Sequence, residues 1–297
     1  MAPCRMRAWF VEVFSIIAVL SFLPMSASAE ICPEHLGRWP YGPNEVVAVA
    51  GDYVYFGSGA VLQIADVSDP SNPVLVGEVV FTSYISGIAV SGDHVYVAHR
   101  EAGLSVIDVS SPSAPNEVGS YVTPLRASDV AVSGDYAYVV DGRLHIIDVS
   151  IPSEPTEAGF LQTYGWSWGV AVAGNYAYLA EGPWGVLVAD VSDPSAPMLG
   201  VVEDTPGLAL DIAVSGGFAY VADFQSGLRV MDLSVPSTPT EVGSVDTPGN
   251  AGEVAVSGNL AYVADGWRGL RVIDVSTTQA TIEFVVPPGN RTVATPI

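Results

Sequence analysis

The sequence contains no lysine, and its ten arginines stand against 32 acidic residues, which gives a formal charge of −22. A field of this sign repels the phosphate backbone of nucleic acids and the surface of anionic membranes. We therefore expect neither nucleic acid nor an anionic membrane among the partners of this protein. Cations, basic protein patches and neutral sugars remain compatible with the charge.

Cysteine and histidine are scarce as well. Of the two cysteines, Cys4 lies in a predicted leader, so Cys32 has no partner for an internal disulfide. The four histidines show no metal-ligand spacing, and the sequence lacks nucleophile, zinc and phosphate-loop motifs. We therefore expect no metal, no cofactor and no catalytic residue, and the protein is predicted not to be an enzyme.

Residues 1–29 have the three parts of a secretory signal peptide. Arg5 and Arg7 precede an apolar stretch, Trp9–Leu23, and Ala27–Ala29 supplies the small-x-small cleavage pattern. The apolar stretch is short for an uncleaved membrane anchor, and no later stretch is long enough to span a bilayer. We expect cleavage before Glu30, no membrane insertion afterwards, and a secreted, periplasmic or cell-surface location.

The chain repeats itself about every 42 residues, as two markers show. The tripeptide Asp-Val-Ser, once Asp-Leu-Ser, begins at Asp66, Asp108, Asp148, Asp190, Asp232 and Asp274. A glycine followed by Asp, Asn or Gly stands at Gly51, Gly92, Gly134, Gly174, Gly216 and Gly258. Because both markers recur in the same phase, the chain is predicted to contain six copies of one structural unit.

Each unit contains four short apolar stretches separated by turn residues. The last clear unit has them at 253–257, 260–264 and 270–275, and the fourth type stands at 241–245. These stretches are rich in Val, Ile and Tyr and lack helical spacing, which indicates strands. A β-solenoid usually has shorter coils without hairpins, whereas four antiparallel strands per 42 residues are typical of a propeller blade. We predict an all-β fold, a six-bladed β-propeller over residues 30–287, with a tail at 288–297.

The turn residues have predicted structural roles. The glycine between the first two strands accepts a positive φ and marks a tight hairpin. The repeated aspartates precede a proline-rich reversal, where their carboxylates can accept hydrogen bonds from nearby backbone amides. Because these segments lack the ligand pattern of a calcium loop, capping of the turn is the preferred interpretation.

Closing the ring requires a fourth strand for the sixth unit. The candidates are Leu36–Tyr41, before the first unit, and Thr281–Val286, after the last. Either stretch would complete a blade shared by both chain ends and remove an exposed sheet edge. The sequence leaves open which of them does so.

Third strands such as Gly103–Ser110 (GLSVIDVS) and Gly269–Ser276 (GLRVIDVS) resemble the LVIVD repeat family, as do the flanking Ala-Tyr-Val-Ala strands and Pro-x-x-Pro segments. The resemblance recurs six times and covers nearly the whole chain after the leader. It implies a β-propeller that is typically bacterial and exported or associated with the cell surface. It implies no catalytic residues.

The loops of a blade divide between two faces. The hairpin after the first strand and the reversal after the third share one nearly uniform face, which suits a structural role. The loops after the second and fourth strands share a variable face, which suits ligand binding. Its candidate ligand-binding residues are Tyr84, Asp129, Trp166, Trp168, Trp184, Asp211, Phe224, Glu253 and Trp267. Further acids of the same loops are Asp141, Glu181, Asp223 and Asp265.

Aromatic side chains among acids suit a sugar, a basic peptide or a cation. The structural alternative is that the aromatics plug the channel mouth while the acids are solvated or cap turns. The leading hypothesis is a non-catalytic extracytoplasmic scaffold that binds a protein or a glycan through the variable face. Acids at the entry to the first strand, such as Asp129, Asp211 and Glu253, are expected near the central channel. Two alternatives remain: a hydrolase or lyase that uses one of these three as its acid or base at the channel mouth, and a structural surface-layer component.

Overall fold

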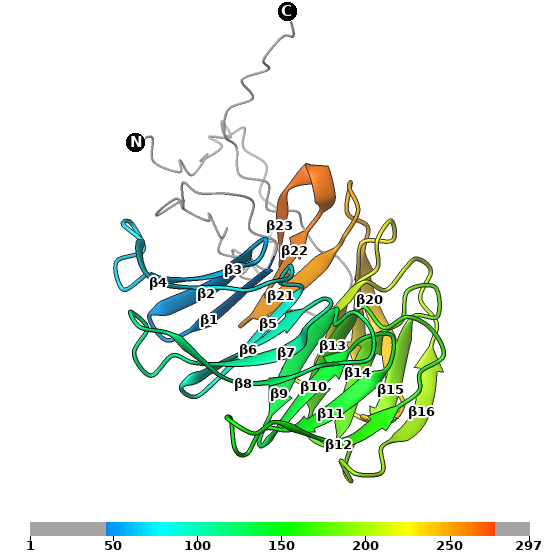
Figure 1. Ribbon diagram of the computed structural model, residues 1–297. Coiled ribbons are helices and arrows are strands. Elements are labelled where there is room, and N and C mark those ends of the chain that lie inside the picture. Colours follow the sequence, from blue (N-terminus) through cyan, green and yellow to red (C-terminus); the bar gives the residue numbers. More distant parts are fainter. Residues whose placement is uncertain (1–45, 277–297) are drawn as a thin grey trace, which may run out of the picture. The chain divides into compact units, whose positions relative to one another are not determined.

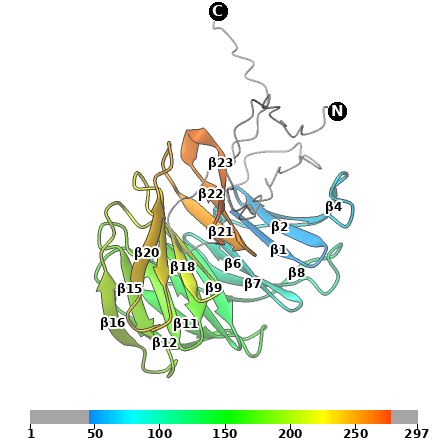
Figure 2. The ribbon, with the colours of Figure 1, turned by 180° about the vertical axis from the view of Figure 1, so that it is seen from behind.

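The computed structural model describes residues 46–276, so the predicted leader, Cys32, both candidate closing strands and the tail lie outside the described residues. Within this range the chain forms six antiparallel sheets, one from each repeat, arranged as the blades of a propeller (Figure 1). Figure 2 shows the same blades from behind. The predicted six-bladed β-propeller is confirmed.

Each blade is built from consecutive strands. Blade one comprises β1 (Val46–Ala50), β2 (Tyr53–Ser58), β3 (Val61–Asp66) and β4 (Val74–Val80). Blade two comprises β5 (Gly87–Ser91), β6 (His94–His99), β7 (Gly103–Asp108) and β8 (Asn116–Tyr121). Blade three comprises β9 (Asp129–Ser133), β10 (Tyr136–Val140), β11 (Leu144–Asp148) and β12 (Thr156–Leu161). Blades four and five comprise β13 (Gly169–Ala173), β14 (Tyr176–Ala180), β15 (Val186–Asp190) and β16 (Met198–Glu203), then β17 (Asp211–Ser215), β18 (Phe218–Ala222), β19 (Leu228–Asp232) and β20 (Thr240–Val245). Blade six shows β21 (Glu253–Ser257), β22 (Leu260–Ala264) and β23 (Leu270–Asp274) among the described residues, with the short 3-10 helix η1 (Gly266–Arg268) before β23. No helix in this part of the chain is long and apolar enough to cross a membrane.

The strands pair in chain order within every blade. The first strands of successive blades, from β1 to β21, lie against one another and surround a central channel. The predicted strands at 253–257 and 260–264 match β21 and β22 without change, while β23 ends one residue earlier than expected. The hairpin prediction is also confirmed, because Gly92 adopts φ +57° between paired Ser91 and His94.

The hydrophobic core lies between neighbouring blades. Leu144, Ile146, Leu179 and Leu187 are fully buried where blade three packs on blade four. Because a propeller blade has a neighbour on either side, its middle strands are covered on both faces and read as continuous apolar runs. Each such buried side chain stabilises the fold by about 1.5–3 kcal/mol.

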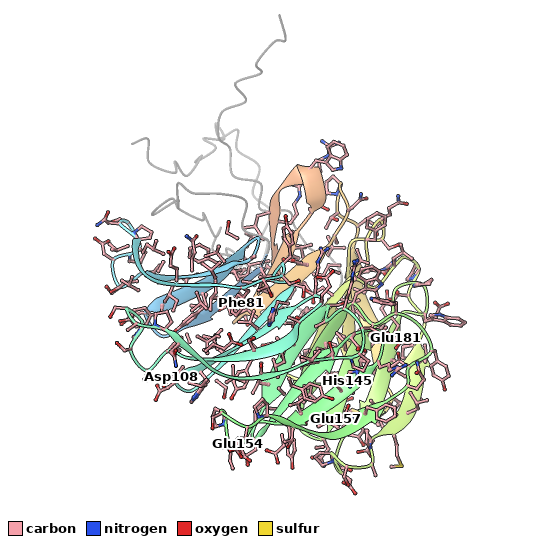
Figure 3. The ribbon with its side chains drawn as sticks, in the orientation of Figure 1. Phe81, Asp108, His145, Glu154, Glu157 and Glu181 are labelled. Atoms are coloured by element: carbon pink, nitrogen blue, oxygen red, sulfur yellow. The ribbon has the colours of Figure 1, made fainter. Side chains whose placement is uncertain are left out.

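The uniform face carries the hairpins and the reversals, and backbone hydrogen bonds join them. Val109, after β7, donates its N–H to the carbonyl of Asp93, in the β5–β6 hairpin, at 2.8 Å. In every blade the aspartate of the tripeptide accepts a hydrogen bond from the serine two residues later, as Asp108 does from the Ser110 N–H at 2.8 Å (Figure 3). This bonding lowers the pKa of Asp108. The predicted capping of the turn is confirmed.

Candidate functional site

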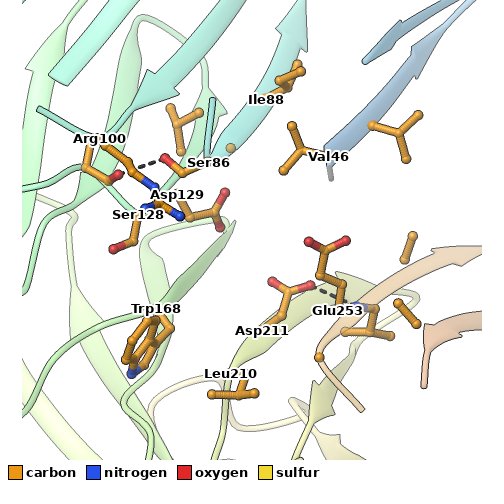
Figure 4. A pocket seen from close by; sticks show the side chains of 18 of the residues that line it. Val46, Ser86, Ile88, Arg100, Ser128, Asp129, Trp168, Leu210, Asp211 and Glu253 are labelled. Carbon is orange, nitrogen blue, oxygen red and sulfur yellow. Dashed lines mark hydrogen bonds between the residues drawn. The ribbon is translucent and has the colours of Figure 1, made fainter. Parts of the chain in front are cut away.

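A cavity of about 1020 Å³ opens at the channel, on the variable face, where the first strands begin (Figure 4). Two positions of each blade shape its wall. The first residues of the first strands are Val46, Gly87, Asp129, Gly169, Asp211 and Glu253, all of which except Gly169 line the cavity. The residues before them in blades two to six are Ser86, Ser128, Trp168, Leu210 and Gly252, and all five line it. We call this space the mouth cavity.

Two of the acids tie neighbouring blades together. Asp129 Oδ2 accepts a hydrogen bond from the Val170 N–H of blade four at 2.9 Å. Asp211 Oδ2 accepts the equivalent bond from the Val254 N–H of blade six at 2.8 Å. Gly169 leaves room for this arrangement, because a Cβ there would lie only 2.9 Å from the Asp211 Cα. The carboxylates are therefore held in fixed positions, and Figure 4 shows them pointing into the cavity with that of Glu253.

The electrostatics of the mouth cavity favour the protonated form of its aspartates. The channel wall shields Asp129 from water and raises its pKa well above the usual range, and repulsion from Asp211 and Glu253 raises it further, against the N–H bonds. Burial also raises the pKa of Asp211. Shifts of this kind gather at functional sites, although structural carboxylates show them too.

Replacing Asp129 by asparagine is expected to flatten the pH dependence of stability. The folded pKa lies above the unfolded one, so ionisation costs stability, and that stability is lost as the pH rises from the unfolded pKa through the folded one. Asparagine retains an oxygen for the Val170 N–H but carries no charge. Thermal midpoints from pH 4 to pH 8 should therefore rise in D129N relative to wild type toward the upper end. If the thermal midpoints of D129N and wild type changed in parallel with pH, the raised pKa of Asp129 would be contradicted. The same rise in thermal midpoint in the exposed control D246N would also contradict it.

Two tryptophans form an aromatic edge on the mouth cavity. Trp166 and Trp168 come from the loop between β12 and β13, line the cavity and are 42% and 49% exposed. Their ring centroids lie 6.5 Å apart, and the ring planes are tilted by 50°. Trp166 lies against Gly142 of blade three and Trp168 faces Gly182 of blade four, so each indole rests on the turn after a second strand. Both residues thus keep nearly half of their surface exposed.

Two arginines also line the mouth cavity. The guanidinium of Arg100 lies 5.7 Å from the centre of the Tyr84 ring. Arg126 Nε lies 3.0 Å from Glu101 Oε1, and the Ser83 hydroxyl donates to the other oxygen of that carboxylate at 2.6 Å. Sequence reasoning did not single out Arg126, although its place three residues before Asp129 puts it in the loop that enters the same strand.

The structure separates four predicted residues from the mouth cavity. Asp129, Asp211, Glu253, Trp166 and Trp168 line it, whereas Tyr84, Trp184, Phe224 and Trp267 do not. Trp184 covers Gly165 and is 54% exposed, while Trp267, in η1, is 97% exposed. Phe224 is the only non-glycine residue of the described chain with a positive φ, and its backbone bonds to Ala251 of the next loop.

Four further acids that were predicted for the variable face are fully buried: Asp141, Glu181, Asp223 and Asp265. They hold the loops that lead into the first strands. Asp223 accepts hydrogen bonds from the Thr205 hydroxyl at 2.7 Å and from the Gly207 N–H at 2.8 Å. For these four the structural alternative, capping of a turn, is the correct interpretation. Within residues 46–276, no group of three or more His, Cys, Asp or Glu side chains is placed to hold a metal ion.

A basic side chain accompanies three of these buried acids: His145 in blade three, Arg229 in blade five and Arg271 in blade six. His145 lies between two carboxylates, with Nδ1 2.7 Å from Glu157 Oε1 and Nε2 3.1 Å from Asp141 Oδ1 (Figure 3). Burial would lower the pKa of His145, but the two carboxylates outweigh it and raise the pKa. These three basic side chains do not line the mouth cavity.

The sequence profile of the LVIVD repeat matches residues 42–80, 84–123, 126–163, 164–205, 206–247 and 248–282. No functionally curated protein matches the chain. Among solved structures, the periplasmic gluconolactonase of Pseudomonas aeruginosa is 16% identical with a TM-score of 0.67, over 82% of this chain and 88% of the other. A Lactobacillus plantarum protein is 16% identical with a TM-score of 0.70, over 82% and 84%. A chain of the mitotic checkpoint complex is 13% identical with a TM-score of 0.70, over 94% and 89%. Identities this low show the shared fold alone.

Proposed function

This chain belongs to the LVIVD repeat family, and we propose that it is a non-catalytic propeller that binds a protein or a glycan at the mouth cavity. The observation that carries the proposal is the cavity itself, whose volume of about 1020 Å³ is at the upper end of the range for ligand pockets. Half-exposed tryptophans and charged groups of both signs line it. Hydrogen bonds between blades fix its wall, so the site is formed before a ligand arrives.

The proposed place of action is outside the cytoplasm. Support comes from the charge pattern, apolar stretch and cleavage pattern of residues 1–29. The periplasmic location of the gluconolactonase concerns that protein and supports this proposal only as a precedent for an exported propeller.

The second candidate is a hydrolase or lyase with its acid or base at the same cavity. The raised pKa of Asp129 favours it, because burial that stabilises the protonated carboxyl is the way general acids are tuned to transfer a proton. The two candidates differ in what D129N does once a ligand is known. If D129N binds the ligand as the wild type does but no longer turns it over, the enzyme is favoured. If the wild type itself shows no turnover, the binding propeller is favoured.

The binding proposal predicts a specific dependence on two tryptophans. The immobilised full chain is incubated with the surface proteins and glycans of the source organism, beside the W166A/W168A and W184A/W267A variants. We expect wild type and W184A/W267A to retain the same ligand, and W166A/W168A, with an unchanged thermal midpoint, to lose at least about 90% of it. Equal retention by all three proteins, or equal loss in both variants, would rule out the mouth cavity as the binding site.

A further inference from the structure

We propose that the mouth cavity binds a neutral carbohydrate, an inference that rests on the proposed binding function and names its ligand class. The wall carries three carboxyl groups and two guanidinium groups. A purely cationic ligand would meet Arg100 and Arg126 in the same space, and an anionic one would meet Asp129, Asp211 and Glu253. Mixed signs therefore disfavour a ligand of strong charge of either sign.

Sugar hydroxyl groups match this wall because each one both donates and accepts hydrogen bonds. The carboxyl groups of Asp129 and Asp211 accept, and the hydroxyl of Ser128 does either. Among the described residues Arg100 forms no ion pair, so its five N–H groups are available to ligand oxygens above the Tyr84 ring. The raised pKa of Asp129 weakens the pull on cations and adds a donor when the group is protonated.

The tryptophans supply aromatic faces on which the apolar side of a sugar ring can pack. The C–H face of a pyranose ring is apolar and packs on an aromatic face, whereas its edge carries the hydroxyls. Trp168 stands where blades two, three, five and six carry Ser86, Ser128, Leu210 and Gly252, and its indole lines the cavity while remaining 49% exposed. Trp166 offers a second face at 50° to the first, which suits the successive rings of an oligosaccharide.

The wall offers little to an extended peptide. A peptide that adds to a strand needs free backbone N–H groups. At the mouth, however, the Val170 and Val254 N–H groups donate to the blade-joining aspartates, and the Ile212 N–H donates to Asp211 Oδ1 at 2.8 Å. Recognition there falls to side chains, and the side chains present suit a sugar better than a peptide.

The test titrates the full chain with cellotetraose, tetra-N-acetylchitotetraose and maltotetraose, following tryptophan fluorescence and heat of binding. Octalysine and trigalacturonic acid serve as the cationic and anionic comparators. We expect at least one neutral tetrasaccharide to bind with a Kd below about 1 mM, W168A to weaken it at least about tenfold, and W267A to leave it within about twofold.

Each outcome has one meaning. Failure of all three tetrasaccharides to bind, or binding that survives in W168A, overturns the carbohydrate inference. Binding of octalysine or trigalacturonic acid alone also overturns it, but if that binding is lost in W168A the proposed function stands with a charged ligand. If W267A loses as much binding as W168A, the mouth cavity is not the binding site. Comparison of the thermal midpoints of the two variants shows that each is folded before its binding is judged.

Discussion

The R229L variant is expected to lose about 3 kcal/mol of unfolding free energy at pH 8, measured by urea denaturation. The Arg229 side chain is 11% exposed and lies 3.1 Å from Glu241 Oε1 and 3.7 Å from Asp223 Oδ2. Leucine would fill much of its volume but leave a fully buried carboxylate without a cation. Removing one partner of a buried ion pair costs far more than removing both.

Blade four supplies the matched control for this variant. At the positions of Arg229 and Glu241 it carries Leu187 and Leu199, and it retains the buried acid, Glu181, on hydrogen bonds alone. The double variant R229L/E241L copies that arrangement into blade five. We expect it to recover at least about half of the loss, because removing Glu241 also removes its repulsion of the Asp223 carboxylate.

The pH dependence of R229L separates charge from packing. Burial already raises the pKa of Asp223, and removing Arg229 takes away an interaction that lowers it. A carboxyl with a raised folded pKa costs stability when ionised, and protonation at low pH removes that cost. The deficit of R229L should therefore shrink between pH 8 and pH 5. A deficit that stays constant, with no recovery in the double variant, would mean that lost packing dominates.

The blades could be predicted from sequence because their signals are local and repeated. The hairpin glycine at Gly92 and the capping aspartate at Asp108 act within a few residues of themselves, so their spacing carries their role. The alternation of loops between two faces follows from antiparallel pairing alone. Asp129 and Asp211 were placed at the channel for the same reason, since the first strand of each blade is the inner one.

The buried acids could not be assigned because their partners come from elsewhere in the chain. Asp223 holds a loop that begins 18 residues before it, at Thr205. A signal was nevertheless present. The sequence Thr-Pro-Gly at 205–207 and again at 247–249 precedes blades five and six, and each blade carries a buried acid and an arginine one position into its third strand. The Thr-Pro-Gly segment and the acid must be considered together to distinguish an acid that holds a loop from one that binds a ligand.

The sequence also could not show which tryptophans reach the mouth cavity. Trp168 and Trp184 both lie on the variable face, yet only Trp168 lines the mouth cavity. Trp168 immediately precedes an innermost strand, β13, whereas Trp184 lies in the turn between β14 and β15, one strand further out. Distance from the propeller axis, rather than residue type, decides which aromatic side chain reaches the channel.

Replacing Gly119 by alanine is expected to lower the free energy of unfolding by about 2–3 kcal/mol. A Cβ on this residue of β8 would overlap the carbonyl oxygen of Pro152, in the reversal of the next blade. The same contact recurs between Gly77 and Pro112 and between Gly159 and Pro194. Because the obstacle is backbone, no rotamer change can relieve it, and the two blades must move apart.

The control is G252A, because a Cβ on Gly252 would meet only the Ala264 carbonyl oxygen among the described residues, at 3.8 Å. Neither glycine has a positive φ, so backbone strain does not distinguish the two variants. We expect G252A to unfold with the wild-type free energy or up to about 1 kcal/mol more, through loss of freedom in the unfolded chain. Urea denaturation of both variants tests this difference. If G119A were as stable as G252A, the close approach of neighbouring reversals would not be a fixed part of the propeller, and its outer strands would have to move freely relative to one another.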